Sequence, residues 1–358
     1  MENAGYMRRA LALAARARGR TRPNPMVGAV LVRQGRVIAE DYHRKAGLPH
    51  AEALVLEKAA ERARGATLYV TLEPCCHTAK RTPPCTRKII ESGVARVVVA
   101  MEDPNPQVSG RGLRQLREAG VEVETGVLED EARRLNEAYA TFMAEGRPFV
   151  ILKTAMTLDG KIATAEGQSK WITGQKARAL VHRLRSSVDA IITAVGTARA
   201  DDPELTARTR GGVNPLRVLI DPRLETPPGS RLFKTPPETL LVTAAAPERT
   251  ADLEAAGVRV LRCPGDVSLQ WLMKELASRC VMSALLEGGS SLNARALEEG
   301  VVDKVMFFIA PKIMGGRGSY PAVGGKVSRP LEEAVRITRT SVRRLGDDFL
   351  IEGYVEKR

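Results

Sequence analysis

The 358-residue sequence predicts an α/β protein made of two domains. Short apolar runs alternate with helical patterns along the chain, which is typical of layered α/β domains with a mostly parallel sheet. The chain is also longer than one hydrophobic core normally serves. A polar segment, Glu145-Gly146-Arg147-Pro148, separates two such α/β series near the middle. We therefore expect domains at residues 1–146 and 147–358.

The first half begins with a helical pattern over residues 3–18 and a pair of apolar strands. The Gln34-Gly35 turn joins strands expected at 27–32 and 37–41. Helices and strands then alternate. The expected elements are helix 51–63, strand 67–72, helix 85–92, strand 96–101, helix 111–119, strand 121–125 and helix 129–144.

The second half restarts with an apolar strand at Phe149, followed by an Asp159-Gly160 turn. We expect segments 303–309 and 335–355 to be closing antiparallel strands. The elements expected between them are helix 174–186, strands 189–195, 216–220 and 239–243, helix 248–256, strand 281–286 and helix 292–299.

Composition excludes several classes of protein. No apolar run approaches the ~18 residues of a membrane span, and arginines interrupt the N-terminal helix, so we expect neither membrane insertion nor a signal peptide. The net charge of +13 is compatible with nucleic acid, an anionic membrane or phosphorylated small molecules. Only 4% of residues are aromatic and the arginines are scattered, which disfavours a stacking surface for nucleic acid. Phosphorylated small molecules are the preferred partners.

One stretch of the first half carries a metal-binding pattern. Pro49-His50-Ala51-Glu52 is followed by Glu73-Pro74-Cys75 and then Pro84-Cys85. A catalytic zinc takes three protein ligands and keeps one open position. His50, Cys75 and Cys85 supply one nitrogen and two thiolates, each at or near an expected helix N-terminus or strand end. Because the five cysteines are an odd number and three fall in this stretch, a reducing cytoplasm is favoured over disulfides.

Glu52 is expected to be a proton carrier and not a ligand, since a glutamate two residues after the histidine is typical of zinc deaminases. A competing hypothesis is a structural zinc, which normally has four protein ligands. That hypothesis requires Cys76 or His77 as the fourth ligand. Unchanged deamination in a Glu52→Ala variant would contradict the catalytic assignment.

A glycine-containing turn, Glu287-Gly288-Gly289-Ser290-Ser291, follows the strand at 281–286 and precedes a helix. Free backbone N–H groups at such a turn can hold a phosphate. The spacing is not the Gly-x-Gly-x-x-Gly dinucleotide fingerprint. The residues alone therefore predict a weak anion site in the second half and no particular reaction.

The sequence resembles the bifunctional deaminase/reductase family of riboflavin biosynthesis over roughly residues 5 to 355. The segments that carry the resemblance occur in both halves. In the first half they are residues 22–28, 49–52, 71–75, 81–85 and 103–108, and in the second half residues 157–163, 169–173, 200–203 and 287–289. The Thr82-Pro83-Pro84-Cys85 form separates this family from cytidine and tRNA adenosine deaminases.

The resemblance implies a cytidine-deaminase-like α/β/α layered domain followed by a dihydrofolate-reductase-like α/β domain. It implies zinc-dependent deamination of 2,5-diamino-6-ribosylamino-4(3H)-pyrimidinone 5′-phosphate. It further implies NADPH-dependent reduction of the ribosyl group of 5-amino-6-(5-phosphoribosylamino)uracil to ribityl. Members of the family assemble as dimers or tetramers, so a homo-oligomer is expected.

Residues are carried over from the family position by position. In the deaminase half, those expected around the pyrimidine and its ribose phosphate are Asn24, His43, His77, Arg81 and Asn105. The Cys75–Cys85 loop is one residue longer than usual and lacks its glycine. This difference leaves open whether Lys80 or Arg81 contacts the substrate, and it makes Cys76 a rival to Cys75 as ligand. Cys75 is preferred because it directly follows Glu73-Pro74.

In the reductase half, the resemblance implies two sets of residues. The substrate-side set is Lys153, Ser169, Arg185, Asp201, Leu205, Arg208 and Glu287. The cofactor-side set is Ala155, Trp171, Thr197, Asp201, Gly289, Ser290, Ser291, Leu292, Asn293, Ala294 and Arg295. Lys153, Asp201 and Glu287 are the polar groups expected to act in catalysis.

An alternative from another class of enzyme is a nucleic-acid base deaminase with an unrelated C-terminal domain. The net charge supports it, whereas the cysteine spacing and the motifs between residues 153 and 208 oppose it. Salt-sensitive RNA binding, together with deamination of a polynucleotide base, would favour it.

Overall fold

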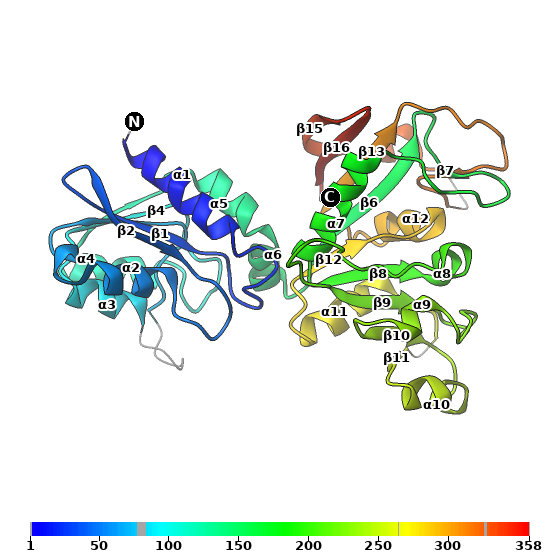
Figure 1. Cartoon of the computed structure of the whole chain (residues 1–358), viewed down its shortest axis with the longest axis horizontal. Helices are drawn as coiled ribbons and strands as arrows, with labels where there is room; N and C mark the ends of the chain where they lie inside the picture. Colours follow the sequence, from blue (N-terminus) through cyan, green and yellow to red (C-terminus); the bar gives the residue numbers. More distant parts are fainter. Residues whose placement is uncertain (1, 77–83, 264, 326–327, 358) are drawn as a thin grey trace. The chain divides into compact units, whose positions relative to one another are not determined.

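The computed structural model describes residues 2–76, 84–263, 265–325 and 328–357. The chain forms two compact units, Met1–Arg147 and Pro148–Arg358. Each unit contains its own central sheet (Figure 1). No helix among the described residues is both long and apolar enough to cross a membrane.

The sheet of the first unit has five strands in the order β2-β1-β3-β4-β5. The strands are β1 (Gly28–Arg33), β2 (Arg36–Tyr42), β3 (Thr67–Val70), β4 (Arg96–Val99) and β5 (Glu122–Thr125). β1 is antiparallel to both β2 and β3, whereas β3, β4 and β5 are mutually parallel. Four of the five strands therefore run in the same direction, as expected, and β1 alone opposes them. The physical reason is the tight Gln34-Gly35 turn, whose two positive φ angles, 51° and 72°, reverse the chain into a hairpin.

Helices cover both faces of this sheet. Figure 1 shows α1 and α5 on one face and α2, α3 and α4 on the other. The helices are α1 (Glu2–Ala15), α2 (Ala51–Ala59) continued by the 3₁₀ turn η1 (Ala60–Ala63), α3 (Cys85–Glu91), α4 (Arg111–Glu118), α5 (Glu129–Leu135) and α6 (Glu137–Glu145). Gly28 on β1 is needed for the close approach of α1, because a Cβ there would collide with the backbone oxygen of Ala10. The unit is an α/β/α sandwich.

The single helix expected at 129–144 is interrupted at Asn136, which separates α5 from α6. The backbone of Asn136 leaves the helical region, with φ −110° and ψ 25°. Its side chain accepts a hydrogen bond from the Met26 N–H at 2.8 Å and donates to the Met26 carbonyl at 3.0 Å. These two bonds fasten the segment after α1 to the α5–α6 junction and explain the interruption.

The second unit contains a nine-stranded sheet in the order β11-β10-β9-β8-β12-β6-β13-β16-β15. Its strands are β6 (Phe149–Thr157), β8 (Ala190–Ala194), β9 (Leu216–Ile220), β10 (Thr239–Thr243), β11 (Arg259–Arg262), β12 (Ser283–Leu286), β13 (Lys304–Ala310), β15 (Ile337–Leu345) and β16 (Asp348–Val355). The expectation for segment 303–309 is half wrong, because β13 is parallel to β6 and antiparallel only to β16. Segment 335–355 is a hairpin of two strands, as β15 and β16 pair antiparallel.

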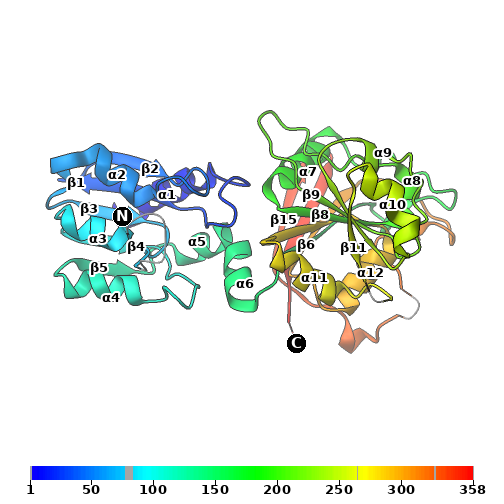
Figure 2. The same cartoon turned by 90° about the horizontal axis from the view of Figure 1, so that it is seen from below.

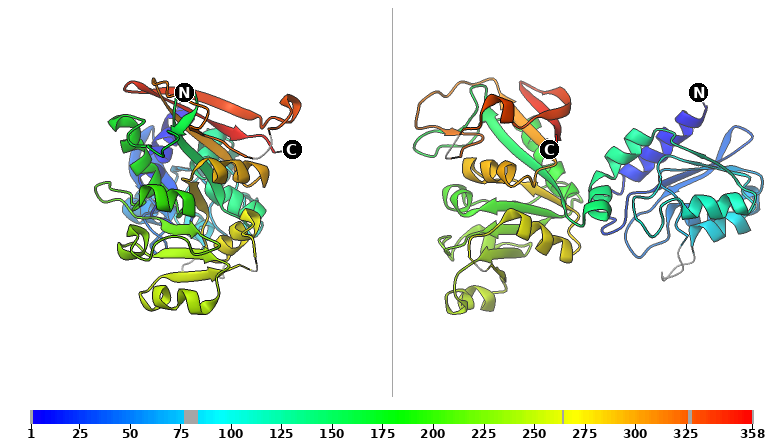
Figure 3. Two further views of the ribbon diagram at one scale, coloured as in Figure 1. Left: turned by 90° about the vertical axis from the view of Figure 1, so that its right-hand side faces the viewer. Right: turned by 180° about the vertical axis from the view of Figure 1, so that it is seen from behind.

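Helices also cover both faces of the second sheet. Figure 2 shows α11 and α12 on one face and α7 and α9 on the other. The helices are α7 (Gln175–Ser187), α8 (Val195–Asp201), α9 (Arg231–Lys234), α10 (Pro247–Ala255), α11 (Leu269–Ser278), α12 (Ser290–Glu298) and the 3₁₀ turn η2 (Leu331–Glu333). A small second sheet pairs β7 (Lys161–Ala163) with β14 (Tyr320–Pro321), which brings two distant loops side by side (Figure 3).

Sequence reasoning missed α8, α9, β11 and α11. A signal for α11 was present, because Leu269, Leu272, Met273 and Leu276 repeat at helical spacing and are all buried in the core of the second unit. Ser268 caps the helix by accepting a hydrogen bond from the Trp271 N–H at 3.4 Å. The short helices α8 and α9 carry no comparable pattern.

Candidate active sites

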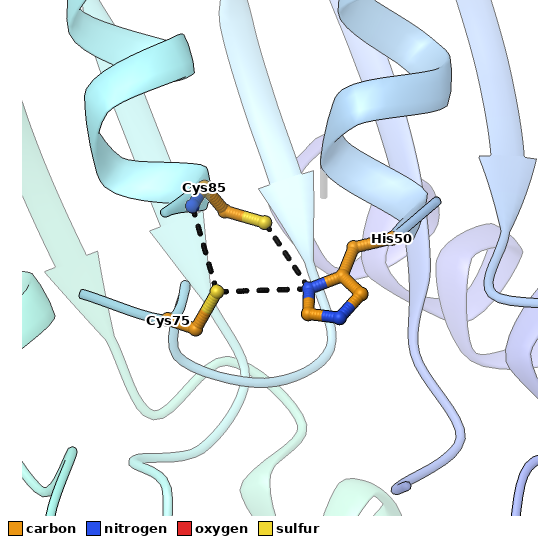
Figure 4. Close-up of side chains that lie close together, drawn as sticks. All are labelled: His50, Cys75 and Cys85. Carbon is orange, nitrogen blue, oxygen red and sulfur yellow. Dashed lines mark hydrogen bonds between the residues drawn. The ribbon is translucent and has the colours of Figure 1, made fainter. Parts of the chain in front are cut away.

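The first site is a cluster of one imidazole and two thiols. The ligand atoms of His50, Cys75 and Cys85 all lie within 4.8 Å of one another. The Nδ1 atom of His50 is 3.3 Å from the Cys85 sulfur and 3.6 Å from the Cys75 sulfur (Figure 4). Cys76 is not a member of the cluster, and His77 lies outside the described residues.

Helix starts and a strand end bring these three side chains together. His50 is the residue before α2, Cys85 is the first residue of α3, and Cys75 lies in the segment after β3. The backbone N–H of Cys85 also points at the Cys75 sulfur, 3.5 Å away. Helix N-termini favour negative charge, so this placement stabilises thiolates. The predicted position at helix starts is confirmed.

The thiols of Cys75 and Cys85 shift each other's pKa in opposite directions. The hydrogen bond from Cys85 lowers the pKa of Cys75 to about 3, assisted by His50. The same hydrogen bond, together with burial, raises the pKa of Cys85 well above its usual value. Zinc binds thiolates and displaces their protons. Two sulfurs and one nitrogen around a common centre therefore fit a zinc site with one open position.

Glu52 lies in the first turn of α2, next to this cluster. Its side chain is buried, and its Oε2 atom has no hydrogen-bond partner among the described residues. Burial raises the pKa of Glu52, and no arginine or lysine contributes to that shift. A buried carboxyl with a free oxygen beside the metal ligands can accept and release a proton at the open position.

Glu73 holds the Cys75 loop, which agrees with the preference for Cys75 as the residue directly after Glu73-Pro74. Its carboxylate accepts backbone hydrogen bonds from Asp103 at 3.1 Å and from Gly110 and Gly112 at 2.9 Å. Gly112 must lack a side chain, because a Cβ there would collide with the Pro74 carbonyl. An acidic residue directly after the apolar strand was the available signal. These bonds fix the loop that carries Cys75 against the start of α4.

The predicted pyrimidine-side residues are partly brought together. The side-chain amide of Asn24 lies 3.1 Å from Nε2 of His43, whose Nδ1 lies 3.1 Å from the Pro49 carbonyl. The rings of His43 and His50 meet edge to face at 5.3 Å. Asn105 accepts a hydrogen bond from the Gln107 N–H at 3.0 Å, within the loop that Glu73 holds. Lys80 and Arg81, like His77, lie outside the described residues.

The second site is a cavity of about 1320 Å³ in the second unit. Most of the reductase residues expected from the sequence line it. They are Lys153, Ala155, Ser169, Trp171, Arg185, Thr197, Asp201, Leu205, Arg208, Glu287, Gly289, Ser290, Ser291 and Leu292. A single small ligand usually occupies about 300–1,000 Å³, so this cavity has room for a dinucleotide and a pyrimidine together.

Three of the expected cofactor-side residues do not line the cavity. Asn293 is buried and donates a hydrogen bond to the Ala322 carbonyl at 2.8 Å. Ala294 is buried in α12, and Arg295 bonds Glu299 at 2.7 Å. From Asn293 onward the backbone N–H groups of α12 are bonded within the helix, as the Asn293 N–H is to the Gly289 carbonyl, so they are not free to hold a phosphate.

Glu287 forms the charged centre of the cavity. Its two oxygens accept a fork of hydrogen bonds from Arg185 at 2.7 and 2.9 Å, and Lys153 Nζ lies 3.3 Å away. Burial alone would raise the pKa of Glu287, but Arg185 and Lys153 outweigh it and lower that pKa to about 2. Glu287 is therefore a fixed anion that orients two cations.

Asp201 and Trp171 also line the cavity. Ser169 Oγ donates to Asp201 Oδ1 at 2.8 Å. Trp171 is 64% exposed, and the Arg178 guanidinium stacks on its ring at 4.7 Å. Lining residues that sequence reasoning missed are Lys170, Arg178, His182, Arg231 and Tyr320.

Comparisons with known proteins cover both units. Residues 1–101 match the family described as "Cytidine and deoxycytidylate deaminase zinc-binding region", and residues 148–351 match "RibD C-terminal domain". The riboflavin biosynthesis protein RibD of Aquifex aeolicus is 45% identical over 97% of this chain and 96% of its own. Two solved structures each cover 99% of both chains. The first is RibD of Acinetobacter baumannii, with a TM-score of 0.90 and 35% identity. The second is the deaminase/reductase of Thermotoga maritima, with a TM-score of 0.87 and 38% identity.

The fold and the two sites define a zinc-dependent pyrimidine deaminase joined to an NADPH-dependent pyrimidine reductase. The chain belongs to the RibD family of bifunctional riboflavin-biosynthesis enzymes. The expected deaminase-like and dihydrofolate-reductase-like folds, the two activities and the two cofactors are confirmed. The match of residues 148–351 excludes the alternative with an unrelated C-terminal domain.

Proposed function

We propose that the first unit deaminates 2,5-diamino-6-ribosylamino-4(3H)-pyrimidinone 5′-phosphate. The second unit then reduces the product, 5-amino-6-(5-phosphoribosylamino)uracil, at its ribosyl group. The Thermotoga maritima relative is described as a diaminohydroxyphosphoribosylaminopyrimidine deaminase and 5-amino-6-(5-phosphoribosylamino)uracil reductase. The observation that carries the proposal is the buried Glu52 carboxyl beside the cluster of His50, Cys75 and Cys85. The same chain also contains the reductase cavity that Glu287 lines.

In the deaminase site, His50, Cys75 and Cys85 would hold zinc, which when bound supplies a water activated at neutral pH. Glu52 takes up a proton at its free Oε2 atom and passes it to the departing amino group. His43 lies beside His50 and contacts Asn24, and these two residues orient the pyrimidine by hydrogen bonds. Arg81 and His77 remain predicted substrate contacts.

In the reductase site, NADPH supplies the hydride. Lys153 and Asp201 are positioned to bind the opened sugar and to supply a proton, while Glu287 keeps Lys153 and Arg185 in place. Trp171, Thr197 and the turn at Gly289 to Leu292 form the cofactor side of the cavity. The roles of Asn293, Ala294 and Arg295 remain predictions from the family.

The test is to follow ammonia release and NADPH consumption with the two pyrimidines offered separately. The diamino compound should give ammonia first and NADPH oxidation second, whereas its deaminated product should give NADPH oxidation alone. If neither compound causes NADPH to be oxidised, the reductase assignment is contradicted. Assembly into a homo-oligomer stays a prediction from the family, which sedimentation velocity tests. A cytoplasmic location stays a prediction from the cysteine count.

A further inference from the structure

One histidine lines the reductase cavity. His182 lies on α7, in the helical turn before Arg185. Its Nδ1 atom is 3.3 Å from the Thr206 carbonyl, and Arg185 donates to the same carbonyl at 3.2 Å. Because the two side chains share one acceptor, His182 lies beside Arg185 and therefore close to the charged centre that Arg185 forms with Glu287.

The bond to Thr206 decides which ring nitrogen of His182 carries the proton. A carbonyl oxygen only accepts hydrogen bonds, so Nδ1 is the donor, and in a neutral imidazole the other nitrogen then holds a lone pair. Burial lowers the pKa of His182, and the positive charge of Arg185 lowers it further, so the ring is neutral at pH 7. Nε2 is therefore a hydrogen-bond acceptor, and it has no protein partner among the described residues.

The carboxylates that line the cavity, by contrast, are already engaged by donors of the protein. Glu287 is held by Arg185 and Lys153, Asp201 by Ser169 and Lys170, Asp202 by the Arg231 N–H, and Glu204 by Arg208 and Arg231. The charged acceptors of the lining are thus occupied, whereas the Nε2 atom of His182 is open to a ligand.

A sugar hydroxyl is the ligand group that fits this position best. Arg185 and Lys153 belong to the side of the cavity where the opened sugar is proposed to bind. A hydroxyl has a proton to donate, and guanidinium and ammonium groups cannot accept it. We propose that His182 is a further substrate-binding residue of the reductase, and that its Nε2 atom accepts a hydrogen bond from a hydroxyl group of the sugar. This inference rests on the proposed function, which supplies the ribosyl group.

The test measures the KM for the deaminated pyrimidine and the KM for NADPH during reduction by the full chain. His182→Asn places an amide at the position of Nδ1, so it can keep the bond to Thr206 but loses the acceptor at Nε2. Its KM for the pyrimidine should rise roughly tenfold, as expected for the loss of one hydrogen bond, while its KM for NADPH stays unchanged. His182→Gln, whose longer side chain places an amide oxygen near the position of Nε2, should restore most of the affinity.

Arg183→Asn is the matched control, because Arg183 is exposed on the same helix and does not line the cavity. It should leave both KM values unchanged. His182→Ala, which removes both bonds, should show the same selective rise for the pyrimidine and serves if the asparagine variant does not fold.

Three results would overturn the inference. A normal KM for the pyrimidine in His182→Asn, with or without a fall in kcat, would mean that Nε2 does not bind the substrate. A rise in the KM for NADPH alone would assign His182 to the cofactor, and equal rises in the asparagine and glutamine variants would show that no acceptor is needed at Nε2. Failure of the wild type to reduce the deaminated pyrimidine would instead refute the proposed function.

Discussion

The two sites each contain a buried glutamate, and the two carboxyl groups behave oppositely. Glu52 and Glu287 are 3% and 9% exposed. Burial raises the pKa of Glu52, whereas the pKa of Glu287 is lowered to about 2 because Arg185 and Lys153 outweigh its burial. A buried glutamate with no arginine or lysine partner can exchange protons, and one held by an arginine and a lysine stays an anion. The neighbours of each carboxyl, and not its burial, set its role.

The strongest test of this difference is Glu52→Ala. Deamination should fall by about 10²–10⁴-fold, the range for a lost general acid–base group. Zinc content and reduction of the deaminated pyrimidine should not change, because no ligand is removed. Glu57→Ala, at an exposed position of the same helix, is the control. Metal analysis and ammonia release measure the two effects, and retained deamination would remove Glu52 from the chemistry.

Arg185→Met tests the balance of charge around Glu287. The substitution leaves the buried Glu287 with Lys153 as its only cationic partner, and breaking a buried ion pair costs up to about 3–5 kcal/mol. The unfolding transition of the second unit should therefore shift to lower temperature in calorimetry, while that of the first unit stays in place. Arg183→Met, an exposed arginine on the same helix, should leave both transitions unchanged. If both variants shift the unfolding temperature of the second unit equally, Arg185 does not stabilise the charge of Glu287.

Lys153→Ala should have the opposite effect to Glu52→Ala, since it should impair reduction and leave deamination intact. NADPH oxidation with the deaminated pyrimidine should fall about 100-fold or more, because Lys153 is a predicted proton source in the cavity. Deamination should be unaffected. Lys274→Ala, at an exposed position on α11, is the control. Loss of both activities in the Lys153 variant would show that the two sites are not independent.

The low pKa of Glu287 predicts a pH dependence of stability. The folded-state pKa of about 2 lies below the ordinary 4.5, so the contribution is present above pH 4.5 and is lost as pH falls toward 2. Between pH 5 and pH 3 the second unit should lose about 2 kcal/mol more in the wild type than in Glu287→Gln. Denaturant unfolding at both pH values measures the difference. An equal loss of unfolding free energy in the wild type and in Glu287→Gln would contradict the low pKa of Glu287.

Local patterns made the metal site predictable. His50, Cys75 and Cys85 lie at helix starts and a strand end, so their spacing along the sequence nearly fixes their positions in space. The interruption at Asn136 was not predictable, because its cause is Met26, 110 residues away. Arg217 also joins distant segments, because it donates to the carbonyls of both Glu204 and Leu232. Contacts of this kind carry no local pattern in the sequence.

The most direct test of the central claim uses NADPH absorbance with both pyrimidines, with and without a zinc chelator. The account predicts that the chelator abolishes NADPH oxidation only when the diamino compound is the starting material, since zinc serves the first site alone. Reduction of the deaminated pyrimidine should continue at its usual rate. Inhibition of both reactions by the chelator would contradict two independent sites, one dependent on zinc and one on the charged groups around Glu287.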